Sequence, residues 1–76
     1  MNTFFENETK SDRFKRVAER RTKVILRDLR IIGNCGNKGN YFYTEEQVRR
    51  IFSEIEQAVK EAKSRFQLAK DKEFKL

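Results

Sequence analysis

A chain of 76 residues with a net charge of +6 has room for one domain, which buries only about 60% of its unfolded surface and is marginally stable alone. The single cysteine, Cys35, excludes an intramolecular disulfide, and the lack of histidine excludes the usual zinc sites and most acid–base catalysis. We therefore expect no enzyme activity, no cofactor and no metal, and we expect oligomerisation to supply the missing stability.

The N-terminal residues, 1–10, read as a polar arm in which Phe4 and Phe5 either dock onto a neighbouring surface or stay exposed. No basic segment followed by a long apolar run opens the chain, so a signal peptide is not expected. The apolar run over 24–26 is far too short to span a bilayer. The pattern predicts a cytoplasmic protein without a membrane association, and an unpaired cysteine suits that reducing compartment.

Residues 11–32 form the first predicted helix, because apolar side chains recur at helical spacing from Phe14 to Ile32. Thr9 or Ser11 can cap its N-terminus, and Thr9 has the capping-box spacing to Asp12. Gly33 is expected to end the helix with a left-handed C-terminal cap.

The other side of this helix carries basic residues at steps of three and four, which place them within about 100° of arc on a helical wheel. We call this set the cationic ridge; it consists of Arg13, Arg16, Arg20, Lys23, Arg27 and Arg30. At 1.5 Å of rise per residue the ridge is about 25 Å long. A row of one sign over five turns favours a polyanion partner. A solvated face that keeps the protein soluble and a membrane-surface helix are the alternatives.

Residues 33–43 form a connector in which Gly-Asn occurs three times. Glycine and asparagine tolerate positive φ, so we expect a tightly turning loop. It serves as a plain connector or, with Lys38 assisting, as an anion-binding nest. Tyr41 and its aromatic neighbours either pack over the end of a helical hairpin or stack on nucleic-acid bases.

Residues 44–70 form the second predicted helix, and this is the strongest periodic signal in the chain. Thr44 is the predicted N-cap, with Gln47 as its capping-box partner. Basic and acidic side chains are nearly balanced along this helix, so its outer face reads as solvated. Residues 71–76 are a fraying tail.

The predicted fold is all-α: an antiparallel helical hairpin, over residues 11–70, that dimerises into a four-helix bundle. A single hairpin leaves one side of each apolar stripe exposed to solvent, and a second copy would cover that side. The expected core and dimer residues are Phe14, Val17, Ile25, Leu29, Ile32, Val48, Ile51, Phe52, Ile55, Val59, Ala62 and Phe66.

Three segments of the chain carry a family resemblance. They are the run Arg13-Phe14-Lys15-Arg16-Val17-Ala18-Glu19-Arg20-Arg21-Thr22, then Leu29-Arg30-Ile31-Ile32-Gly33-Asn34, and Asn40-Tyr41-Phe42-Tyr43-Thr44-Glu45-Glu46. Together they resemble small uncharacterised basic proteins of bacterial mobile genetic elements. The resemblance implies a genomic context and no particular activity. In layout the chain is also similar to Rop, a plasmid copy-number regulator that forms a dimer of helical hairpins and binds paired RNA loops. The long Gly-Asn loop departs from Rop's tight turn.

These features predict a small regulatory or accessory protein whose ridge, with Lys38 and Tyr41, contacts nucleic acid, DNA or RNA, mainly through phosphates. If all six ridge cations contacted duplex DNA, the slope of log K against log salt would be about −5 per protomer. The alternative is an adaptor or inhibitor that docks the same ridge on an acidic protein surface. A structural bundle without a polyanion partner is a third hypothesis.

Overall fold

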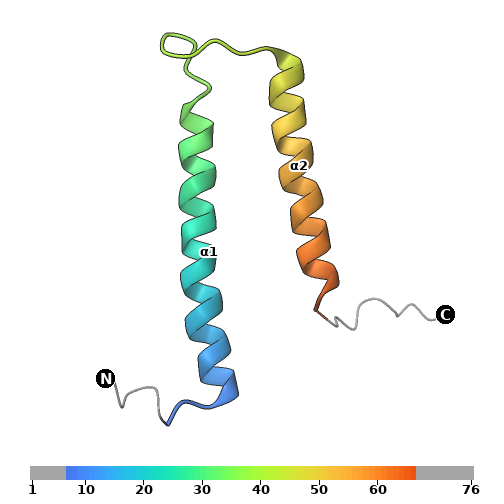
Figure 1. Cartoon of the computed structure of the whole chain (residues 1–76). Coiled ribbons are helices and arrows are strands. Elements are labelled where there is room, and N and C mark those ends of the chain that lie inside the picture. The colour runs from blue at the N-terminus through green and yellow to red at the C-terminus, as the bar shows by residue number, and fades with distance from the viewer. Residues whose placement is uncertain (1–6, 67–76) are drawn as a thin grey trace, which may run out of the picture. The chain divides into compact units, whose positions relative to one another are not determined.

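The computed structural model describes residues 7–66, and these contain two helices and no strand (Figure 1). Helix α1 spans Lys10–Asn34 and helix α2 spans Glu45–Ser64. The prediction of an all-helical chain with two helices is therefore confirmed. Most of the predicted arm (1–6), the end of the predicted second helix (67–70) and the predicted tail (71–76) lie outside the described residues.

Both helices begin with a complete capping box, as the sequence predicts. The Thr9 hydroxyl accepts a hydrogen bond from the Asp12 amide at 3.0 Å, and the Thr9 amide donates to the Asp12 carboxylate at 3.3 Å. The Thr44 hydroxyl accepts from the Gln47 amide at 3.0 Å, and the Thr44 amide donates to the Gln47 side chain at 2.9 Å. These bonds satisfy amides that an uncapped helix would leave without partners.

The C-terminus of α1 differs from the prediction. Gly33 lies inside the helix, and Cys35 is the C-cap with an ordinary right-handed φ of −71°. Among residues 7–66 neither a glycine nor any other residue has a positive φ, so the predicted left-handed cap at Gly33 is wrong. Tight turns close the end instead, because the Cys35 and Gly36 amides donate to the carbonyls of Ile32 and Gly33 at 2.9 and 3.0 Å.

The connector is organised around Asn37 and again does not use positive φ. The Asn37 side-chain oxygen accepts from the Gly39 amide at 2.9 Å, and its carbonyl accepts from the amides of Asn40 and Tyr41 at 3.0 and 3.1 Å. An added Cβ at Gly39 would stand 3.1 Å from that side-chain oxygen. Glycine is therefore favoured here by close approach, whereas the sequence-based reasoning rested on left-handed backbone.

Helix α2 ends at Ser64, earlier than the predicted end near residue 70. The Ser64 hydroxyl donates to the Glu61 carbonyl at 2.7 Å. The Arg65 and Phe66 amides donate to the carbonyls of Ala62 and Lys63, three residues back, at 3.1 Å each. A serine hydroxyl that competes for a helix carbonyl and a shift to three-residue bonds are typical of a terminating turn. Periodicity alone did not show this end.

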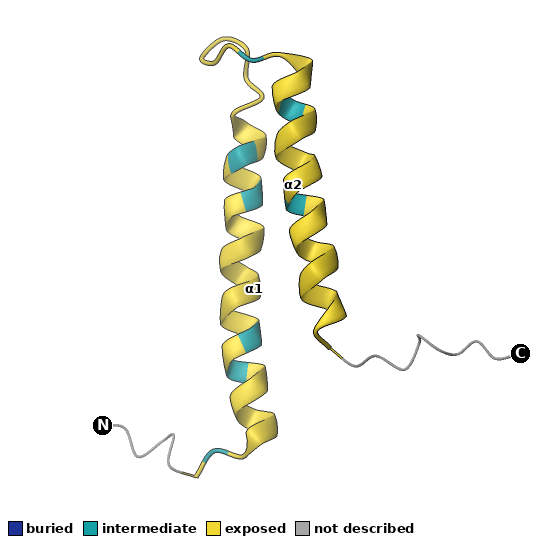
Figure 2. Cartoon of the chain, turned by 45° about the vertical axis from the view of Figure 1, so that its right-hand side comes forward, coloured by how far each residue is buried: buried dark blue, intermediate teal, exposed yellow. Residues whose placement is uncertain are grey.

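No residue from 7 to 66 is buried (Figure 2). Of the twelve predicted core residues, Leu29, Ile32, Val48 and Ile55 are half-buried. The others are exposed: Phe14, Val17, Ile25, Ile51, Phe52, Val59, Ala62 and Phe66. The core that these residues were expected to form therefore stays a prediction.

Candidate functional site

Helix α1 carries the whole cationic ridge on one unbroken helical segment. All six cations fall within Lys10–Asn34, and neither a proline nor a break interrupts the helix between Arg13 and Arg30. Their steps of three and four residues therefore place them along one face, as predicted. The large exposed apolar side chains of α1 include Phe14, Ile25 and Ile31.

The N-terminal end of the ridge is occupied by a carboxylate from the same chain. Arg16 donates from Nε to one oxygen of Glu8 at 2.6 Å and from its terminal nitrogen to the other at 3.1 Å. Arg13 lies 3.8 Å from the same carboxylate. The Glu8 side chain is only 9% exposed and the Arg16 side chain 39% exposed. This is the bidentate geometry that arginine forms with carboxylates and phosphates.

The titration of this pair reflects the hydrogen bonds. The bond from Arg16 has the largest effect and lowers the pKa of Glu8. Desolvation, which comes next, raises it, and the charges of Arg16 and Arg13 lower it further. The same bond raises the pKa of Arg16. Both groups are therefore held in their charged forms.

The rest of the ridge is more open. Arg27 pairs with its neighbour Asp28 at 3.1 Å, but the two side chains are 60% and 57% exposed, so the pair is weak and screened by salt. Within residues 7–66, Arg20, Lys23 and Arg30 form no ion pair with a carboxylate. A shallow hollow on this part of α1 is lined by Lys23, Arg27 and Arg30 together with Val24 and Leu26.

The remaining predicted contact residues lie in the connector after α1. Lys38 and Tyr41 are both exposed, and Tyr41 exposes 52% of its surface. Phe42, the next residue, exposes 97%. The predicted anion nest loses its usual basis, because such nests commonly alternate right- and left-handed residues and the described connector contains no positive φ.

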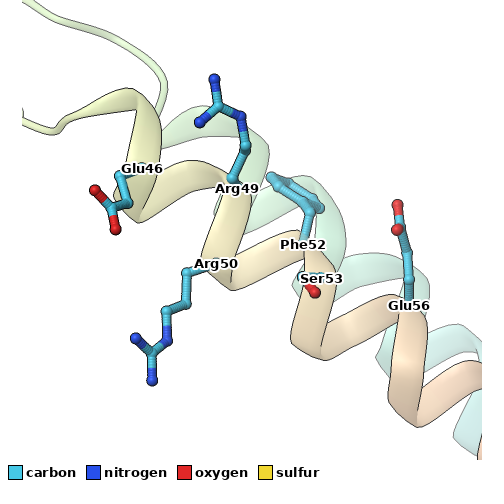
Figure 3. A pocket seen from close by; sticks show the side chains of 6 residues that line it. All are labelled: Glu46, Arg49, Arg50, Phe52, Ser53 and Glu56. Atoms are coloured by element: carbon cyan, nitrogen blue, oxygen red, sulfur yellow. The ribbon is translucent and has the colours of Figure 1, made fainter.

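Helix α2 has a shallow hollow of its own, but its side chains do not converge. In Figure 3, Arg49, Phe52 and Glu56 extend on one side of the helix, and Glu46 and Arg50 on another. Arg49 also pairs with Glu45 at 3.2 Å along the helix. Two acidic and two basic side chains therefore line this hollow, so neither sign of charge predominates in it.

Within residues 7–66, no group of three or more histidine, cysteine, aspartate or glutamate side chains is placed so that it could hold a metal ion. Neither described helix is both long enough and apolar enough to cross a membrane.

Sequence reasoning missed Glu8, which was assigned to a polar arm. The residue just before an N-cap lies where the chain turns into the helix, so its side chain can reach the first two turns. A carboxylate at that position, followed by arginines five and eight residues later, is the signal that could have found the pair.

Comparison of the chain with protein-family models, with curated proteins and with solved structures gave no match.

Proposed function

We propose that this protein is a small non-enzymatic regulatory or accessory protein that binds the phosphates of nucleic acid through the cationic ridge of α1. Its context would be a bacterial mobile genetic element and its compartment the cytoplasm. Recognition would be largely independent of base sequence, because a smooth row of arginine and lysine on one helix reaches backbone phosphates and offers no fixed hydrogen-bond pattern for bases.

The observation that carries this proposal is the set of exposed cations without carboxylate partners. A helix face that serves only for solubility usually mixes both signs. Here Arg20, Lys23 and Arg30 form no ion pair within residues 7–66, and Arg27 has only an exposed, weak one. Like charges this close repel one another, and a polyanion would relieve that repulsion.

We further propose that the two helices form an antiparallel hairpin, laid out as in Rop, and that two copies associate into a four-helix bundle. The support is the open apolar surface. Phe14 and Ile25 of α1 expose more than half of their surfaces, and no residue from 7 to 66 is buried. A chain of this length cannot leave both stripes in water and remain folded, and a second copy offers the same stripes with matching length.

The test is salt-dependent binding by the purified full-length protein. A labelled 20-base-pair DNA duplex and an RNA duplex of the same sequence are titrated at several salt concentrations. The proposal predicts that log K falls steeply and linearly with log salt for at least one of them. An affinity that does not change with salt would rule it out.

A pull-down from a cell lysate separates this function from docking on an acidic protein. Recovery of nucleic acid that nuclease treatment removes supports the proposal. Recovery of a single protein partner that stays bound after nuclease treatment would instead support an adaptor or inhibitor that docks the ridge on an acidic protein surface.

A further inference from the structure

The two ends of the cationic ridge are not equivalent. At the N-terminal end, Arg13 and Arg16 share the Glu8 carboxylate at 3.8 and 2.6 Å. At the C-terminal end, Lys23 and Arg30 have no carboxylate within ion-pair distance among residues 7–66, and the side chains of this part are exposed. A polyanion that approaches α1 therefore meets one end whose two arginines share a shielded carboxylate, and one end whose ion pair within residues 7–66, Arg27 with Asp28, is exposed to solvent.

Glu8 holds Arg16 in the way that a phosphate would. The two hydrogen bonds, at 2.6 and 3.1 Å, use two of the donors through which arginine binds phosphate oxygens. The Glu8 side chain is 9% exposed, so this is a shielded contact and not a pair in open solvent. A phosphate could reach these donors only by displacing Glu8, and the lost hydrogen bonds would offset much of the gain.

The C-terminal end offers a hollow in which an anion could lie. Lys23, Arg27 and Arg30 stand at steps of four and three residues and line it together with Val24 and Leu26. Among residues 7–66 the one carboxylate paired with Arg27 is that of its exposed neighbour Asp28, and exposed pairs of this kind contribute about 0–1 kcal/mol. Three cations can therefore turn toward one segment of phosphate backbone at little cost.

We propose that the ridge is divided: Lys23, Arg27 and Arg30, with Arg20 beside them, form the phosphate-binding segment, and Glu8 acts as a built-in competitor that holds the Arg13–Arg16 end closed. This inference rests on the proposed function and deepens it, because it names the part of the ridge that binds and the residue that limits binding.

The experiment compares two variants with the same loss of charge. Lys23→Gln with Arg30→Gln removes two cations from the binding segment, and Arg13→Gln with Arg16→Gln removes two from the closed end. Glu8→Gln removes the competitor, and Glu54→Gln on α2 is its charge-matched control. Each is titrated with the 20-base-pair DNA and RNA duplexes over a range of salt, after circular dichroism has established that its helix content is unchanged.

We expect the Lys23/Arg30 variant to flatten the slope of log K against log salt by about 2 and to weaken binding at 0.1 M salt by roughly 60-fold. The Arg13/Arg16 variant should change affinity by less than about threefold. Glu8→Gln should steepen the slope by about 1–2 and tighten binding, whereas Glu54→Gln should not. Glu8→Gln should also lose its effect when Arg13 and Arg16 are already glutamine.

Equal losses in the two double variants, or equal effects of Glu8→Gln and Glu54→Gln, would overturn the divided ridge and leave the proposed function standing. A wild-type protein that binds neither duplex would overturn both. If a double variant does not fold, the single variants Arg30→Gln and Arg13→Gln repeat the comparison, and equal losses in these two would overturn the inference in the same way.

Discussion

Helices α1 and α2 are alike in what makes them helices and unlike in the charge that they present. Each begins with a threonine in a complete capping box, and each carries an apolar stripe that is not buried. The ridge of α1 has one sign throughout, whereas Glu46, Arg49 and Glu56 follow one another along α2. The capping boxes and apolar stripes are therefore common to both helices, and the row of like charges, on which the proposed function rests, belongs to α1.

The residue before each N-cap sharpens the same contrast. Before Thr9 of α1 stands Glu8, whose carboxylate reaches forward to Arg16. Before Thr44 of α2 stands Tyr43, which is half-buried, as is Val48. The carboxylate pairs with arginines of its own helix, while an aromatic ring at this position is typical of a hydrophobic staple. With Thr44 as the N-cap, Tyr43 and Val48 stand at the two positions that such a staple joins.

The largest expected effect tests the shared apolar stripes. In the proposed dimer, Ile32→Ala on α1 and Ile55→Ala on α2 should each lower the free energy of unfolding by about 2–5 kcal/mol. Leu26→Ala, outside the predicted core, should cost less than about 0.5 kcal/mol. Urea unfolding at fixed protein concentration measures all three. Equal small costs would mean that the stripes are not covered.

The next effect should separate the two helices. Arg20→Glu with Arg27→Glu should weaken duplex binding roughly a hundredfold at 0.1 M salt, because contacts are lost and repulsion is added. Lys60→Glu with Lys63→Glu changes the charge of α2 by the same amount and should cost less than about tenfold. An electrophoretic shift assay measures the affinities. Similar losses from both variants would mean that binding depends on the net charge of the protein and not on the ridge.

The caps should again behave alike. Thr9→Ala and Thr44→Ala should each destabilise the protein by about 1 kcal/mol, since each leaves a first-turn amide without its hydroxyl acceptor. Thr22→Ala, in the middle of α1, is the matched control and should be neutral or slightly stabilising. Thermal unfolding followed by circular dichroism gives the comparison. A cap variant no worse than Thr22→Ala would refute the importance of that capping box.

Gly33 distinguishes a helical position from a left-handed cap. An added Cβ at Gly33 meets no atom within 4 Å, and the residue has helical backbone. Gly33→Ala should therefore stabilise the protein by about 0.5–1 kcal/mol. The effect is measured by thermal unfolding. If Gly33→Ala instead destabilised the protein, the result would favour the left-handed cap that the sequence predicted.

The smallest effect concerns Glu8 and acid. Because the pKa of Glu8 in the folded protein lies below its ordinary value of 4.5, the unfolded chain binds this proton more readily. The pair therefore stabilises the fold above about pH 4.5, and this contribution disappears as the pH falls through the lowered pKa. Wild type should be more stable than Glu8→Gln at neutral pH and equal to it in strong acid. A difference that does not depend on pH would exclude the ion pair as its cause.

Local rules predicted the helix starts and failed at the helix ends. A capping box lies within four residues, so Thr9 with Asp12 and Thr44 with Gln47 could be identified from spacing alone. The end at Ser64 depends on a hydroxyl that competes for a carbonyl, and Gly33 is compatible with both a helix and a cap. Glycine permits a conformation without requiring it, so the end of α1 could not be read from composition.

The position of the cationic ridge could be predicted from the sequence, but its contact with Glu8 could not. Positions along a regular helix follow from the 3.6-residue period, which placed all six cations on one face. The contact between Glu8 and Arg16 spans the N-cap Thr9, whose backbone is extended, with φ and ψ of −78° and 170°, and therefore not helical. A periodic pattern contains no information about such a contact.

The most direct test of the account is the salt dependence of duplex binding by the unmodified protein. With four ridge cations in contact with phosphate, the slope of log K against log salt should lie between about −3 and −4 for each protomer bound to DNA. A slope flatter than about −1 would show that the open cations of α1 do not bind phosphate, and it would contradict the central claim.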